Sequence, residues 1–167
     1  MKRLIVSLLL LPALSACGLQ PLYSSGSSGA VAAVLQNVDV AAIPGRAGWL
    51  TRNAINDRLS ASGSGEPQYR LDVKLDDNIE GFGVRSDDSV TRERRTLRAR
   101  YQLVELSTGK TVLDATAGSD AGIDVVSSEY ATRAAGNTAL ENLSKEVAIQ
   151  IVTRLSLYAR AKANRSE

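Results

Sequence analysis

The chain has 167 residues, with 20 lysines and arginines against 18 aspartates and glutamates, one cysteine and no histidine. That length suffices for one domain with its own core. Without histidine, the chain can hold no Ser–His or Cys–His catalytic pair and no metal site built on imidazole ligands. The acidic neighbours Asp76–Asp77 and Asp87–Asp88 are expected to point apart and stay solvated. We therefore expect no enzyme, no metal site and no cofactor.

The N-terminal segment has the three parts of a secretion signal. A positive start, residues 1–3, precedes an apolar run over residues 4–11, which is too short to span a bilayer at about 20 apolar residues. Leu-Ser-Ala then precedes Cys17, and this pattern resembles a bacterial lipobox. We predict that residues 1–16 are a signal peptide and that Cys17 is lipidated. The alternative is a free thiol in an ordinary secreted protein.

Lipidation at Cys17 has consequences for the rest of the chain. Each buried CH₂ of an acyl chain contributes ~0.8 kcal/mol to anchoring, so several chains attach the protein permanently. The signal that retains a lipoprotein in the inner membrane resembles an aspartate directly after the lipidated cysteine. This chain has Gly18 at that position, which favours the outer membrane of a Gram-negative cell. Removal of residues 1–16 takes away Lys2 and Arg3, which leaves 18 basic and 18 acidic residues. This balance gives no argument for a nucleic-acid partner.

The remaining chain is predicted to hold a single domain. A lipidated, flexible tether over residues 17–30 includes the run Ser-Ser-Gly-Ser-Ser-Gly-Ala at its end. The domain is expected over residues 31–162, followed by a tail at 163–167. No repeat and no second domain are apparent.

The first half of this domain predicts a strand, a helix and a second strand. Residues 34–43 form the first strand, ended by Pro44–Gly45, and residues 47–61 have apolar side chains at helical spacing. Residues 69–76 alternate apolar and charged side chains, which is typical of a strand with one buried face. Residues 80–89 are predicted to be a polar loop.

The second half predicts two further strands and a long helix. Residues 91–104 alternate in the same way, residues 107–110 make a tight hairpin connection, and residues 111–117 form the last strand. After a soft stretch at 118–128, residues 130–161 carry an apolar stripe at helical spacing. The order β-α-β-β-β-α predicts an α+β two-layer sandwich. Its four-stranded sheet has two helices on one face, and its other face is polar.

Arginines are concentrated in one strand. The segment 91–100 contains five arginines and one glutamate. The strand period places four of them on the polar face along ~27 Å, at ~3.4 Å per residue. The fifth, Arg95, points the other way, beyond the helix cover. Because the arginine fork binds phosphate in bidentate fashion, the candidate binding residues for a multi-phosphate ligand are Arg70, Arg92, Arg94, Arg98, Arg100 and Lys110.

A solvated charge ladder is the competing interpretation of these arginines. If the strands at 69–79 and 91–101 form a hairpin, one register places Asp72 opposite Arg98 and Asp76 opposite Arg94. Each such pair contributes only ~0.2–1 kcal/mol. That register leaves the remaining charge on three cations, Arg70, Arg92 and Arg100. Both interpretations stay open at this point.

The whole pattern resembles the LPS-assembly lipoprotein family, LptE. The motifs that carry the resemblance are Cys17-Gly-Leu-Gln-Pro-Leu-Tyr23, Leu50-Thr-Arg-Asn-Ala-Ile-Asn-Asp-Arg-Leu59, Tyr69-x-Leu-x-Val, Ala99-Arg-Tyr-x-Leu103, Thr108-Gly-Lys110, Tyr130 and Ile151-Val-Thr-Arg-Leu155. One departure is Leu19, where an aromatic residue is more usual. The resemblance covers most of residues 17–158.

This resemblance implies a lipid-anchored outer-membrane protein on the periplasmic side. Such a protein plugs the LptD β-barrel, assists the assembly of that barrel and binds lipopolysaccharide. The resemblance implies no catalytic residue. Two alternatives remain: an auxiliary lipoprotein of an ABC-type lipid-transport system, and a structural envelope lipoprotein without a ligand.

Overall fold

The computed structural model describes residues 29–84 and 90–165. The predicted signal peptide, Cys17 and nearly all of the predicted tether lie outside the described residues, as do Asp87 and Asp88. The helices and strands follow the order α2 (Ala30–Leu35), β1 (Val38–Val40), α3 (Gly45–Ser60), β2 (Tyr69–Val84), β3 (Val90–Glu105), β4 (Thr111–Asp124) and α4 (Glu129–Ala163).

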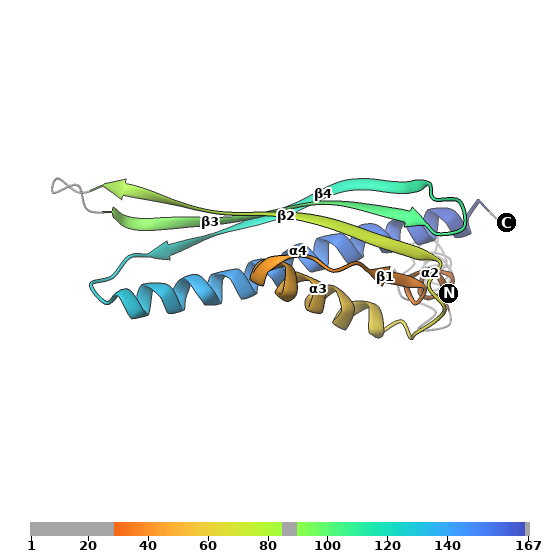
Figure 1. The fold of residues 1–167 in the computed structure, drawn as a ribbon, viewed down its shortest axis with the longest axis horizontal. Helices are drawn as coiled ribbons and strands as arrows, with labels where there is room; N and C mark the ends of the chain where they lie inside the picture. The colour runs from red at the N-terminus through yellow and green to blue at the C-terminus, as the bar shows by residue number, and fades with distance from the viewer. Residues whose placement is uncertain (1–28, 85–89, 166–167) are drawn as a thin grey trace, which may run out of the picture.

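The four strands form one sheet in the order β1-β2-β3-β4. β1 is parallel to β2, and the two other pairs are antiparallel. The described helices all lie on one side of this sheet, and the opposite side is bare (Figure 1). The predicted α+β sandwich with the order β-α-β-β-β-α is therefore confirmed, with α2 as an additional short helix.

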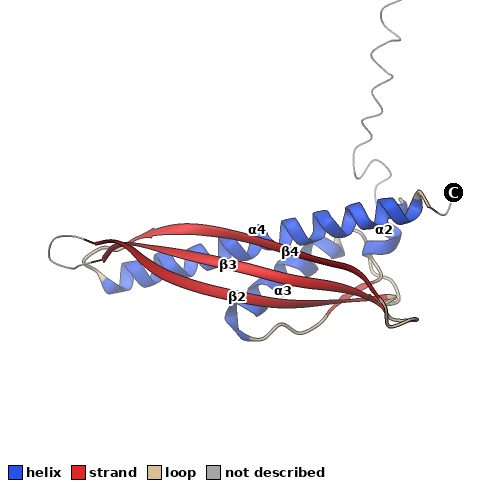
Figure 2. Cartoon of the chain, turned by 90° about the horizontal axis from the view of Figure 1, so that it is seen from above, coloured by secondary structure: helices blue, strands red, loops and turns tan. Residues whose placement is uncertain are grey.

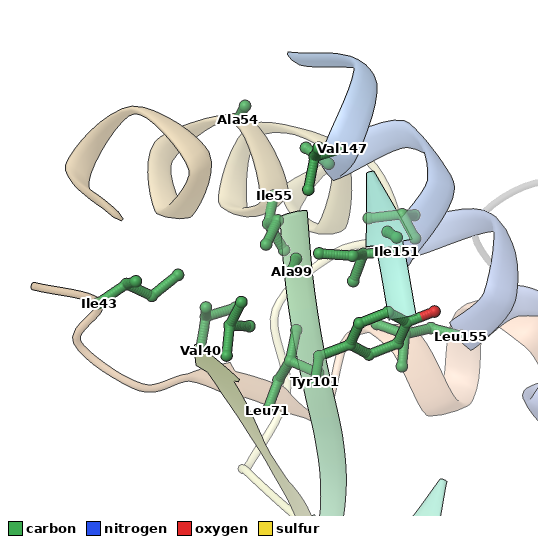
Figure 3. Packing of buried hydrophobic residues seen from close by; sticks show 14 of the residues in the cluster. Val40, Ile43, Ala54, Ile55, Leu71, Ala99, Tyr101, Val147, Ile151 and Leu155 are labelled. Carbon is green, nitrogen blue, oxygen red and sulfur yellow. The ribbon is translucent and has the colours of Figure 1, made fainter. Parts of the chain in front are cut away.

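The core lies between the sheet and the helices because side chains alternate along each strand. On β3, alternate residues turn inward and are buried: Leu97, Ala99, Tyr101 and Leu103. Ala99 and Tyr101 meet Val147, Ile151 and Leu155 of α4, together with Ile55 of α3 (Figure 3). Nothing in this core carries a charge, so the layers are held by apolar packing.

Helix α4 runs along the whole length of the sheet (Figures 1 and 2). Its 35 residues span about 52 Å at 1.5 Å per residue. Its N-cap is Ser128, whose hydroxyl accepts a hydrogen bond from the Ala131 amide. The predicted stripe is buried from Leu140 to Leu155, and half-buried Tyr158 packs against the same core. None of the described helices is long and apolar enough to cross a membrane.

The predicted strand over residues 34–43 is wrong in extent. Residues up to Leu35 belong to helix α2, and the strand consists of three residues, Val38–Val40. Ala32 and Leu35 lie three residues apart on one face of α2, and both are buried. The run of alanine and valine thus satisfies a helix as well as a strand, and packing decides in favour of the helix.

The two polar stretches predicted as loops are largely strand. β2 continues to Val84 and β4 continues to Asp124, so the loops assigned to 80–89 and 118–128 begin too early. The glycines and acidic residues in both stretches favour loops by composition. Pairing with β3 outweighs that preference. β3 lies between β2 and β4 and pairs with both, so each of these two strands continues along it.

Candidate functional site

The bare face of the sheet carries the charged side chains that the strand alternation excludes from the core. On β3 the four outward arginines are exposed: Arg92, Arg94, Arg98 and Arg100. Their neighbours on β2 and β4 are residues of even number, because the register pairs even with even across the middle of the sheet. We call this surface, formed by the even-numbered side chains of β2, β3 and β4 between Arg70 and Asp124, the open face.

The register predicted for the β2–β3 hairpin is wrong by four residues. Asp76 lies opposite Arg98, Asp72 lies opposite Gln102, and Lys74 lies opposite Arg100. The shift follows from the longer β2 strand, which moves the turn toward the C-terminus. Because four is an even number, every side chain keeps its predicted face while its partner changes.

Arg100 is neutralised by the strand on its other side. Its guanidinium donates to both carboxylate oxygens of Asp114 on β4, at 3.3 and 3.0 Å. Gln102 donates to the same carboxylate at 2.8 Å. The hydrogen bond from Arg100, followed by the one from Gln102, lowers the pKa of Asp114 below its ordinary value. The hydrogen bond to Asp114 and the charge of that carboxylate in turn raise the pKa of Arg100.

Arg70 and Arg92 are neutralised in a similar way. Arg70 donates three hydrogen bonds of 2.9 to 3.1 Å to Asp72, two residues along the same strand. This contact raises the pKa of Arg70. Arg92 donates to Asp124 of β4 at 3.1 Å. The three arginines predicted to be unpaired are therefore the paired ones.

The remaining outward cations are Arg94 and Arg98, which were predicted to be paired, together with Lys74. Within the described residues, no ion pair with a carboxylate forms at Arg94, Arg98 or Lys74. Arg94 lies over the ring of Phe82, 5.3 Å from its centroid. Arg98 lies across β4 at Gly118, where an added Cβ would come within 2.5 Å of its Cδ atom.

A hollow of about 710 Å³ lies in the middle of the open face. Its polar lining includes Lys74, Asp76, Arg98, Arg100, Thr116 and Asp120. Gly118 has no side chain to fill this space. Lys74 and Arg98 therefore offer unpaired positive charge beside a hydroxyl and an open volume, which suits a phosphate or another anion. In the described part of the chain, no three acidic side chains group as a metal would require.

The sequence prediction missed Lys74 as a candidate binding residue. The alternation in β2 already placed its side chain on the outward face. It stands beside Arg100 and close to the unpaired Arg98. The predicted residue Lys110 lies instead in the β3–β4 turn and does not line the hollow.

The prediction that Arg95 lies beyond the helix cover is wrong. Its side chain lies on the helix side of the sheet and contacts α4. Its guanidinium donates to both carboxylate oxygens of Asp77, at 2.8 and 2.6 Å, and to the carbonyl of Gly136 on α4, at 2.8 Å. The start of α4 at Glu129 brings that carbonyl over this part of the sheet. Asp76 and Asp77 point to opposite faces, as the alternation predicts.

Comparison with known proteins gives one family and a set of solved structures. The profile of the family described as LptE, lipopolysaccharide-assembly, matches residues 35–155, well over half of the chain. No curated protein sequence matches the chain.

Solved structures of bacterial lipoproteins share the fold. A protein from Caulobacter crescentus described as a lipoprotein has a TM-score of 0.64 at 25% identity, over 80% of this chain and 98% of that one. Rare lipoprotein B from Shewanella oneidensis has a TM-score of 0.60 at 10% identity, over 78% and 98%. A lipoprotein B from Nitrosomonas europaea has a TM-score of 0.60 at 12% identity, over 77% and 86%.

Proposed function

From the premise that this chain belongs to the LptE lipopolysaccharide-assembly family, we propose that it is a lipid-anchored lipoprotein of the outer membrane. In this proposal Cys17 carries the anchor, and the domain sits inside a β-barrel partner of the LptD type. There it supports assembly of the barrel and binds lipopolysaccharide in transit. No step of this function requires a catalytic residue.

The match to the LptE family carries the proposal, and the open face agrees with it. A protein inside a watery barrel needs an outer surface that stays solvated, and the open face is covered with charged side chains. A lipid anchor keeps the domain at high effective concentration near a barrel in the same membrane.

We assign the phosphate groups of lipopolysaccharide to the cations without an ion pair among the described residues, Lys74, Arg94 and Arg98. A phosphate that approached Arg70, Arg92 or Arg100 would first have to displace a carboxylate from each guanidinium. At Lys74, Arg94 and Arg98 a phosphate has no ion-paired carboxylate of the described residues to displace. This assignment changes the set of residues that sequence alone favours.

Two triple variants of the protein lacking residues 1–17 test the assignment. Lys74→Ala/Arg94→Ala/Arg98→Ala removes three unpaired cations, and Arg70→Ala/Arg92→Ala/Arg100→Ala removes three paired ones from the same face. We expect the first variant to lose most lipopolysaccharide binding and the second to retain most of it. Equal binding by both variants would refute the assignment of the site. Circular dichroism checks that both variants remain folded.

Copurification tests the partner. The full-length lipoprotein is solubilised from outer membranes in detergent and captured through a C-terminal tag. We expect a large β-barrel protein to copurify in stoichiometric amount. Recovery with an inner-membrane permease complex would instead favour an auxiliary role in ABC-type lipid transport.

A further inference from the structure

The two edges of the sheet differ in how their backbone groups are satisfied. An edge strand presents a row of N–H and C=O groups that can pair with another strand. On β4, the side-chain amide of Gln150 occupies part of that row. It accepts from the Gly118 N–H at 3.1 Å and donates to the Gly118 carbonyl at 3.1 Å. The amide thus takes the place of a neighbouring strand at this point.

The opposite edge, on β2, is covered only at its beginning. β1 pairs with β2 at three positions, from Tyr69 to Leu71. The last contact of this row is the Ala41 amide, which donates to the Leu71 carbonyl at 3.1 Å. Within residues 29–84 and 90–165, no strand pairs with β2 on this side beyond that point. β2 forms the margin of the sheet along most of its length (Figure 2).

The direction of the free backbone groups follows from the strand geometry. Tyr69 donates its N–H and Leu71 offers its carbonyl toward the β1 side, so odd-numbered residues of β2 turn their backbone groups outward. Residues in an antiparallel pair alternate in this respect. Beyond β1, five residues therefore turn both groups away from β3, toward the outer side of the sheet: Val73, Leu75, Asp77, Ile79 and Gly81. Gly83, with a φ of +77°, ends this regular stretch.

Space for an additional strand begins where β1 ends. A cavity of about 490 Å³ lies beside the departing chain at Ala41–Ala42 and β2 at residues 72–74, and it extends over the open face to Arg100 and Gln102 of β3. An added strand would continue the row that β1 starts. We name the outward-facing stretch of β2 from Val73 to Gly81 the β2 edge.

The side chains beside the β2 edge define the chemistry of its occupant. On the open face, Asp76 and Glu80 lie four residues apart, and neither forms an ion pair with a described residue. On the helix side, Leu75 is half-buried and Ile79 is 47% exposed. Lys74 precedes these two carboxylates on the same face, so a strand that pairs from Asp76 onward and alternates basic and apolar side chains would meet carboxylates on one face and apolar surface on the other.

We propose that the β2 edge receives an extended segment of a partner protein, which adds to the sheet as a strand and alternates basic with apolar side chains. Main-chain hydrogen bonds supply the affinity and the alternating side chains supply the specificity. A second copy of this chain is the competing occupant and an outcome of the test below: an antiparallel β2–β2 register centred on Asn78 sets Asp76 against Glu80, whereas one centred on Asp77 sets Lys74 against Glu80. The proposal does not depend on the ligand assigned to the open face, although Asp76 lines the hollow as well as the β2 edge.

Amide hydrogen exchange on the protein lacking residues 1–17 tests the geometry first. In the free protein, the amides of Leu75, Asp77 and Ile79 should exchange quickly, while those of Lys74, Asp76 and Asn78 are protected by β3. A blocked seven-residue peptide that alternates lysine and valine is then added as the probe. Protection should appear at the three outward amides. Outward amides already protected in the free protein would overturn the proposal.

Ile79→Pro removes an outward N–H and leaves the hydrogen bonds between β2 and β3 in place. We expect it to weaken binding of the peptide by roughly five- to tenfold, as the loss of one backbone hydrogen bond implies. The matched control Ile79→Ala keeps the N–H and should bind more tightly than the proline variant. Unchanged binding by Ile79→Pro overturns the proposal, as does a shift to dimer on addition of the peptide.

A charge variant tests the preference for basic side chains. Asp76→Asn/Glu80→Gln should abolish the difference between the lysine–valine peptide and a glutamate–valine peptide. The control Glu66→Gln/Glu146→Gln removes the same number of exposed carboxylates away from the open face and should retain that difference. Equal binding of the two peptides by the parent protein would contradict the proposed chemistry.

Discussion

The two faces of strand β3 contribute very differently to the stability of the protein. Leu97 is fully buried against the helices, while its neighbour Arg98 is exposed on the open face. The buried side chains hold the layers together, since burying one leucine contributes about 1.5–3 kcal/mol. The open-face ion pairs contribute about 0–1 kcal/mol each. Stability thus depends on one face of the strand, and the other face is free to serve a ligand.

The largest expected effect of a substitution lies at the centre of the buried face. Leu97→Ala should lower the free energy of unfolding by about 2–5 kcal/mol, because it removes buried methyl groups and leaves a cavity. The control Arg98→Ala, one residue away, should change it by less than about 0.5 kcal/mol. Urea denaturation measures both. Similar losses in the two variants would contradict the division of roles between the faces.

Arg95 is the charged exception on the helix side, and its substitution should give the second largest effect. Arg95→Ala removes two hydrogen bonds to Asp77 and one to the Gly136 carbonyl. We expect a loss of about 1–3 kcal/mol in the free energy of unfolding, because a partly buried carboxylate and a carbonyl lose their partner. Arg94→Ala, on the open face, removes an exposed cation–π contact with Phe82 and should cost no more than about 0.5–1 kcal/mol. Equal stability of the two variants would show that the hydrogen bonds of Arg95 to Asp77 and to the Gly136 carbonyl do not stabilise the fold.

Buried hydroxyls provide a smaller test of the helix side. The hydroxyl of Ser144 is buried and, among the described residues, has no hydrogen-bond partner. Ser144→Ala should therefore leave stability unchanged or raise it by up to about 1 kcal/mol. The control is Ser156→Ala, which removes a buried hydroxyl that donates to the Val152 carbonyl at 2.8 Å. Thermal unfolding should rank Ser144→Ala above Ser156→Ala, and the reverse ranking would contradict the assignment.

The smallest effect concerns pH and the open face. The pKa of Asp114 is lowered in the folded protein from its ordinary value of 3.8. Its contribution to stability is thus present above that value and is lost as the pH falls through the lowered pKa. Asp114→Asn should flatten the decline of the urea midpoint below about pH 4, while Asp120→Asn retains the parent profile. Identical profiles for all three proteins would exclude a role for the Asp114 pair.

The sequence predicted the layers well because alternation is a local property. The charged and apolar residues of β2 and β3 occupy the faces that their order in the chain assigns. The ends of the strands depend on partners elsewhere, so glycines and acidic residues near Gly81 and Gly118 were taken for loops. Helix α2 was missed because a run of alanine and valine gives no clear period.

The candidate site was predicted as a face but not as a set of contacts. Which arginines are neutralised depends on register and on the position of Asp114 and Asp124 on a strand far along the chain. A shift of four residues preserves every face and exchanges every partner. Periodicity alone therefore could not separate Arg98, which has no ion pair among the described residues, from Arg100, which has one.

Gly118 connects these observations, since the side chain of Arg98 rests on the backbone where a methyl group would otherwise stand. The position of the Arg98 guanidinium on the open face thus depends on Gly118, an uncharged residue on β4. An alanine at this position would lift the guanidinium, because the end of the flexible arginine chain yields more easily than the sheet. The height of this cation above the pleat can accordingly change without any change in the number of arginines.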